Sequence, residues 1–164
     1  MAGRMYTVEF EAQTIAAASG DYDLFYIAPV DEKPVEIHAF SIDVTSELAE
    51  AQEEWLRLRM IRGHATVGSG GTAVAASAIG KSPGDVDASF TARTCDSAIA
   101  TTGTLRNLWS GAMNVRSGCR EIFTPEQREP LRCSQTEVSV LIRLMAAVAD
   151  DVTMSGTLWV EELI

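Results

Sequence analysis

The side chains that could carry chemistry in this chain are its two histidines and three cysteines, and their spacing matches no common reactive site. A three-histidine metal site within one chain is impossible, because His38 and His64 are the only histidines. An odd number of cysteines without CxxC spacing argues against a disulfide framework and against a zinc site. We therefore expect Cys95, Cys119 and Cys133 to be reduced thiols, and we expect no metal and no cofactor.

Motifs for nucleophilic catalysis and for phosphate binding are matched no better. The GSGG stretch at Gly68–Gly71 lacks the lysine and the strand–helix context of a phosphate-binding loop. Ser155 is not a nucleophile elbow, because position 153 is threonine where the GxSxG spacing requires glycine. The acidic pair Asp150–Asp151 is typical of a turn, and Glu161–Glu162 is typical of a solvated chain end. These patterns favour a structural or binding protein over an enzyme, and we expect no catalytic residue.

Strands are the elements that must position any surface this chain uses, because its clearest pattern is alternation with a period of two. In the stretch EWLRLRMIR, Leu56, Leu58 and Met60 share one face while Arg57 and Arg59 share the other, which predicts a strand in a sheet with one dry and one wetter face. Strands are expected at Met5–Phe10, Leu24–Ala28, Val35–Val44, Glu54–Arg62, Thr104–Trp109, Ala112–Val115, Arg120–Phe123, Glu137–Leu144 and Thr153–Glu161, with a turn at Pro125–Pro130.

About eight to ten short antiparallel strands separated by turn signals are typical of an all-β fold, either a β-sandwich or a jelly roll. The length of 164 residues predicts a single domain spanning residues 1–164. Residues 63–103 are rich in Gly, Ser and Ala, and we expect a long loop-rich insertion there. Short strands within it are expected at Thr72–Ile79 and Ala88–Thr94.

Two segments leave alternatives open. Thr45–Glu54 has the best helical composition, and a continuous helix from Ser46 to Arg62 competes with the strand at its C-terminal half. The Leu–Arg alternation favours the strand, since a helix requires apolar spacings of three and four. In Val35–Val44 the alternation changes parity between Ala39 and Ile42, which indicates a bulge or a strand buried on both sides.

The charge of the chain limits its partners. A net charge of −10 disfavours general nucleic-acid binding, which needs an excess of Lys and Arg at the phosphates. Residues 63–134 carry +1, whereas the segments before and after carry −7 and −4, so this middle part is the better candidate to face an acidic protein. Apolar runs are far shorter than the ~20 residues that span a bilayer, so we expect no membrane partner. The N-terminus has no apolar signal core, which predicts a protein that folds in the cytoplasm.

Aromatic and cationic residues at strand ends are the candidates for an interaction surface. Trp55, Trp109 and Trp159 are expected to be core or sheet-face residues, and Trp109 is the best candidate to anchor a subunit contact, because Trp is enriched at interface hot spots. His38 is expected to be exposed or half-buried in its strand. The chosen interface residues are Arg62, His64, Trp109 and Arg116, although a solvated turn is the default environment for His64.

The chain resembles a family of small proteins encoded in the head-gene modules of tailed bacteriophages. The residues that carry the resemblance are MYTVEF near the N-terminus, LRLRMIRGH with the SGG that follows it, NVRSG at Asn114–Gly118 and VTMSGTLWVEEL at the end. They run in order over most of the chain. The resemblance implies a capsid decoration (cement, or auxiliary head) protein with a β-sandwich or jelly-roll fold.

The family also implies partners and a location. Such proteins bind the outside of the phage head, often as homotrimers, and stabilise contacts between major capsid protein subunits. We therefore expect the major capsid protein and other copies of this chain as partners, and a virion protein assembled in the host cytoplasm. The alternative is a receptor- or glycan-binding β-sandwich of a head fibre or tail.

Overall fold

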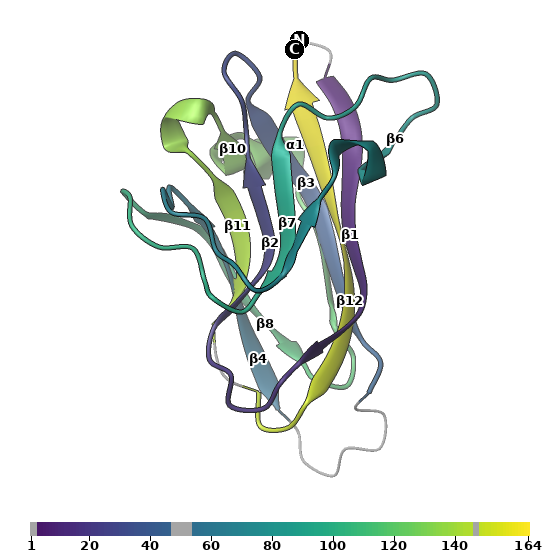
Figure 1. Cartoon of the computed structure of the whole chain (residues 1–164), viewed down its shortest axis with the longest axis vertical. Helices are drawn as coiled ribbons and strands as arrows, with labels where there is room; N and C mark the ends of the chain where they lie inside the picture. Colours follow the sequence, from purple (N-terminus) through teal and green to yellow (C-terminus); the bar gives the residue numbers. More distant parts are fainter. Residues whose placement is uncertain (1–2, 47–53, 146–147) are drawn as a thin grey trace.

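In a computed structural model, two six-stranded antiparallel sheets pack face to face, which confirms the predicted all-β sandwich (Figure 1). The structure describes residues 3–46, 54–145 and 148–164. The first described residue, Gly3, pairs with Leu163, so the two ends of the described chain lie at the same end of the sandwich. Within the described residues there are twelve strands, somewhat more than expected, and two of them are only two residues long.

The first sheet has the order β10–β3–β12–β1–β6, and β9 also pairs with β3. Its strands are β1 (Gly3–Ile15), β3 (Val35–Val44), β6 (Gly80–Lys81), β9 (Cys119–Ile122), β10 (Arg132–Cys133) and β12 (Val152–Leu163). The second sheet has the order β5–β7–β2–β11–β4–β8. Its strands are β2 (Tyr22–Ala28), β4 (Trp55–Arg62), β5 (Thr72–Val74), β7 (Thr91–Asp96), β8 (Arg106–Asn114) and β11 (Val140–Leu144).

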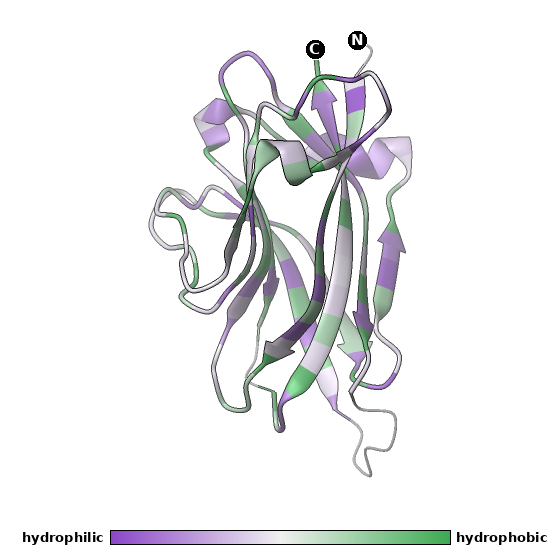
Figure 2. Cartoon of the chain, turned by 45° about the vertical axis from the view of Figure 1, so that its right-hand side comes forward, coloured by the Kyte–Doolittle hydropathy of each residue, from purple (hydrophilic) through white to green (hydrophobic). Residues whose placement is uncertain are grey.

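Alternation builds the core between the sheets. Along β12, successive residues are buried and half-buried in strict alternation, with Met154, Leu158 and Val160 inside. The same banding of hydrophobic and hydrophilic residues runs along the other long strands (Figure 2). Because side chains alternate across a strand, each sheet presents one apolar face to the other.

The strand predicted at Glu54–Arg62 is confirmed as β4, so a continuous helix through Arg62 is wrong. Most of the helix expected at Thr45–Glu54 lies outside the described residues. β3 contains a bulge, as expected, but it lies at His38 and not between Ala39 and Ile42: Ala39 and Ile37 pair with consecutive residues of β12, which leaves His38 as the extra residue. Residues 104–115, expected as two strands, contain the single strand β8.

The turn expected at Pro125–Pro130 contains α1 (Pro125–Arg128) and the 3-10 helix η2 (Glu129–Leu131). A capping box forms there: the backbone N–H of Thr124 donates to the Gln127 side chain over 2.8 Å, and the Thr124 side chain accepts in return. Two further 3-10 helices are η1 (Ala76–Ala78) and η3 (Gln135–Glu137).

The prediction of a solvated end at Glu161–Glu162 is wrong for Glu162, which is fully buried. β12 is a central strand of its sheet, and every second side chain along it is buried, up to and including Glu162. The Glu162 carboxylate accepts from the backbone N–H of Ser89 over 2.8 Å and lies 3.6 Å from the Lys33 ammonium. These two partners compensate the buried charge.

Residues 63–103 contribute β5 and β7 to the second sheet and β6 to the first, and the part around Ala100 folds over the outer face of the second sheet. β5 and β7 lie near the two strands expected there, and both are shorter or shifted. Ala100 packs against Tyr26, Ile61 and Leu141, which form a small second core on that face. Alternation places Arg143 opposite the apolar residues Val140 and Ile142, on the face expected to be the wetter one, yet Arg143 is only 6% exposed and pairs with Asp23 over 2.6 Å.

Candidate interaction surface

The structure places three of the four chosen interface residues along β8 and its neighbours, and buries the fourth. Arg62 ends β4 opposite Arg106, Trp109 lies within β8, and Arg116 is exposed in the turn that follows β8. The Arg62 Nη1 group donates to the carbonyl oxygen of Arg132, so this side chain holds the β10 segment against β4.

His64 offers no surface to a partner, because its side chain is only 3% exposed. The default of a solvated turn histidine is wrong for the same reason: the segment that returns after β7 covers it. Neither ring nitrogen has a hydrogen-bond partner that meets normal geometry. Burial lowers the pKa of His64, and the positive charge of Arg143 lowers it further.

Trp109 belongs to an aromatic cluster at the side of the sandwich where the two sheets meet. Its ring lies 5.2 Å from Phe40 and 6.5 Å from Phe123, both edge-to-face. Gly111 leaves room for the ring, since an added Cβ would come within 2.5 Å of it. The cluster therefore anchors β8 to the first sheet while leaving one side of Trp109 accessible.

Two hollows meet at this cluster, and together we call their lining residues the β9 surface. One, of about 280 Å³, lies between β8 and β9; the other, of about 370 Å³, lies on the outer face of the first sheet. Both are bordered by Ile122, which is 67% exposed, and by Phe123. The remaining residues that define the β9 surface are Met5, His38, Ala39, Leu108, Trp109, Arg120, Glu121, Gln127, Arg128, Pro130, Leu131 and Trp159.

The residues that define the β9 surface include two arginines and one acid, in a chain of net charge −10. Glu36 and Glu161 lie beside His38 at its edge. The Arg120 guanidinium lies 5.8 Å from the centre of the Trp159 ring, so it covers that ring while presenting its charge. An exposed isoleucine between arginine side chains has the composition of a protein-binding surface, in which Arg and aromatic residues are enriched.

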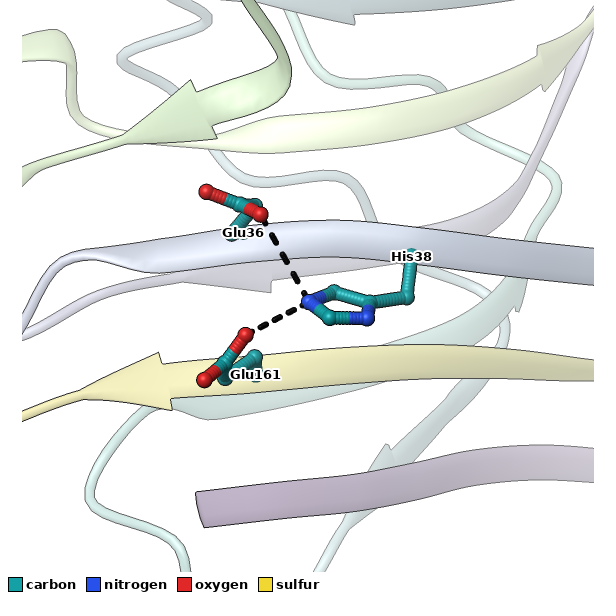
Figure 3. Close-up of side chains that lie close together, drawn as sticks. All are labelled: Glu36, His38 and Glu161. Carbon is teal, nitrogen blue, oxygen red and sulfur yellow. Dashed lines mark hydrogen bonds and ion pairs between the residues drawn. The ribbon is translucent and has the colours of Figure 1, made fainter. Parts of the chain in front are cut away.

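Glu36, His38 and Glu161 come together at the edge of this surface and are the described residues that could hold a metal ion (Figure 3). His38 Nε2 lies 2.6 Å from Glu161 and 3.6 Å from Glu36 (Figure 3). Glu36 is already paired with Arg132 over 2.5 Å, and Arg128 lies 3.8 Å from the same carboxylate. Two guanidinium groups compete with a cation for these oxygens, so the cluster fits an ion-pair network better than a metal site.

A third hollow lies at the start of β8, where the chain is strained. It has a volume of about 450 Å³ and is bordered by Arg62, Arg106 and Glu137. Val138 closes it with φ 69° and ψ −56°, and the backbone N–H of Ser139 donates to the Glu137 carbonyl over 2.8 Å. This is a γ-turn with positive φ, which is costly for a β-branched residue and is found where surrounding structure enforces it.

Ile122 is the central residue of the β9 surface and is not among the interface residues predicted from the sequence. The pattern REIF at positions 120–123 contains the signal, because alternation that buries Phe123 must expose Ile122. The sequence does not show that β9 has a strand on one side only.

No protein-family model, curated protein or solved structure matches this chain. Among the described residues, no helix is both long and apolar enough to cross a membrane.

Proposed function

We propose that this chain is a structural virion protein: a capsid decoration protein that binds the outside of a tailed-phage head and stabilises contacts between major capsid protein subunits. The observation that carries the proposal is the β9 surface, in which Ile122 stands exposed among arginines on an otherwise acidic chain. The resemblance of the sequence to phage head proteins supplies the partner.

In this proposal the β9 surface is the face that meets the shell. Burying Ile122 against a capsid subunit removes apolar surface from water, and the exposed Arg120 steers the approach to an acidic partner. One such contact is modest in area. Copies repeated by symmetry, in a homotrimer that engages several capsid subunits at once, bind far more tightly through effective concentration.

Co-sedimentation tests the proposal, using purified capsids of the encoding phage that lack this protein. Wild-type protein should saturate the capsids at a fixed ratio. Ile122→Asp should bind at least about tenfold more weakly, since it places a charge where an isoleucine would be buried. Val86→Asp is the matched control: Val86 is also exposed, lies in the segment between β6 and β7, and should bind as wild type does.

Two results would contradict the proposal. One is wild-type protein that does not sediment with capsids, and the other is Ile122→Asp protein that binds as well as the control.

Light scattering should give a mass of three chains of 17.7 kDa. Capsids without the protein should lose heat tolerance, and unchanged tolerance would remove the stabilising role. Binding to a glycan array in place of capsids would favour the receptor- or glycan-binding alternative.

A further inference from the structure

β8 is an unusually long edge strand. In the part of the chain that the structure describes, the other strands at the sheet edges are β5, β6, β9 and β10, which have two to four residues each, whereas β8 has nine. β1 also has an open side, because β6 pairs only with Tyr6 and Thr7, but a bulge after Phe10 interrupts that side. Sheet edges are normally short or covered, because a row of unpaired backbone N–H and C=O groups can pair with another strand. β8 is long and carries neither proline nor lysine.

The regular part of this edge is its C-terminal half. A bulge places Leu108 between Asn107 and Trp109, which pair with Ile61 and Met60. From Trp109 to Asn114 the pairing with β4 is continuous. The Asn114 carbonyl already accepts from the backbone N–H groups of Ser117 and Gly118, so residues 109–113 form the regular strand along the free side of β8.

The ribbon formed by β4 and β8 is strongly cationic. The two strands contain four arginines and no acidic residue, within a chain of net charge −10. Arg59 lies opposite Ser110 on the strand next to the free edge, whereas the Arg57 guanidinium, opposite Ala112, donates to the Met145 carbonyl on the β11 side.

The hollow at the start of β8 adds a site for a carboxylate. Arg62 and Arg106 are cross-strand partners, and like charges directly opposite each other are destabilising. The Arg62 Nε group is buried and has no hydrogen-bond partner. Glu137 also borders the hollow, but its carboxylate already accepts from the backbone N–H of Ser134 over 2.8 Å.

We infer that β8 accepts an extended acidic segment of a partner protein as an additional strand, with one carboxylate of that segment between Arg62 and Arg106. Main-chain pairing supplies affinity in such strand addition, and side-chain chemistry supplies specificity. A second copy of this chain is a poor occupant, because pairing β8 with β8 would set two ribbons of four arginines side by side. The inference does not depend on capsid binding.

The test uses the isolated full-length chain and a nine-residue peptide, capped at both ends, in which Glu alternates with Val and Thr. NMR amide exchange should show new protection on peptide binding at the alternate amides within residues 109–113 that point away from β4. The same peptide with Lys in place of Glu should not bind. Arg106→Glu should weaken binding at least about tenfold, whereas Arg4→Glu, which changes the net charge equally but lies on β1, should leave it unchanged.

Four results would overturn the inference. They are no binding of the acidic peptide up to millimolar concentration, protection only outside β8, undiminished binding by Arg106→Glu, and undiminished binding of a peptide methylated at alternate backbone nitrogens, which cannot pair as a strand. A dimer in light scattering with β8 amides already protected would assign the edge to a second copy. Each result is obtained without capsids, so it leaves the co-sedimentation experiment independent.

Discussion

Replacing Arg143 with methionine should destabilise the fold by about 3–5 kcal/mol, because it leaves the Asp23 carboxylate buried without a cation. Asp23 and Arg143 are 1% and 6% exposed and are joined by two hydrogen bonds, of 2.6 and 3.1 Å. Arg143 also donates to the carbonyl oxygen of Ala100 over 2.8 Å, so its loss releases the returning segment from the second sheet.

Urea unfolding at pH 7 measures this loss, and the melting temperature should fall by roughly 6–20 °C for a chain of this size. Arg59→Met is the matched control. Arg59 faces Arg143 across β4 and β11 but is half-exposed, so its replacement should change the free energy of unfolding by no more than about 0.5 kcal/mol.

The double variant Asp23→Asn with Arg143→Met separates a buried charge from lost packing. It should recover at least half of the loss, since an amide in place of the carboxylate removes the unpaired charge. A double variant that loses the sum of the two single losses would refute the reasoning, because it would mean that the charge of Asp23 is not the source of the cost.

Three further predictions concern buried groups. The lowered pKa of His64 means that the folded chain binds a proton there less readily than the unfolded chain, so neutral His64 contributes stability above about pH 6.5 that is lost as pH falls below that value. Between pH 7.5 and 5 the free energy of unfolding should therefore depend less on pH in His64→Gln than in the wild type, and equal pH dependence would contradict a lowered pKa for His64. Gly103→Ala should destabilise more than Gly84→Ala, since both glycines have positive φ but only at Gly103 would a Cβ meet backbone, 2.0 Å from the Gly63 oxygen; equal losses in urea would exclude that contact as the cause. Burial raises the pKa of Cys95 and Cys133 to about 12, so Ellman's reagent at pH 8 should react with these two thiols only in denaturant. Half-buried Cys119 should react in the native protein. Fast reaction of a native Cys119→Ser variant would show that Cys95 and Cys133 are not protected.

Strands with clean alternation could be predicted from the sequence, because their pattern arises from one buried face. β3 agrees with its predicted bounds, and β4 differs only by one residue at its start. β1 extends beyond its prediction because backbone pairing with β12 continues on both sides of a bulge after Phe10. Short apolar patterns do not encode such pairing.

What the sequence could not predict is which outer face becomes covered. Alternation along β11 places Arg143 on the face opposite the core, where a side chain is expected to be exposed. Residues 97–103 nevertheless fold over Arg143 and over His64. Trp109 was predicted as an anchor from its residue type alone, and the structure places it in an aromatic cluster beside the β9 surface. Ile122 is the centre of that surface because β8 and β9, which belong to different sheets, lie next to each other at one side of the sandwich, and the sequence pattern does not encode this contact.

Cryo-electron microscopy of capsids with and without this protein would show whether the β9 surface binds a phage shell, as we propose. We expect additional density on the outside of the shell, into which the sandwich fits with Ile122 and Arg120 against capsid subunits. Density that places the opposite side of the sandwich, at β5 and β6, against the shell would contradict the proposal, as would identical maps with and without the protein.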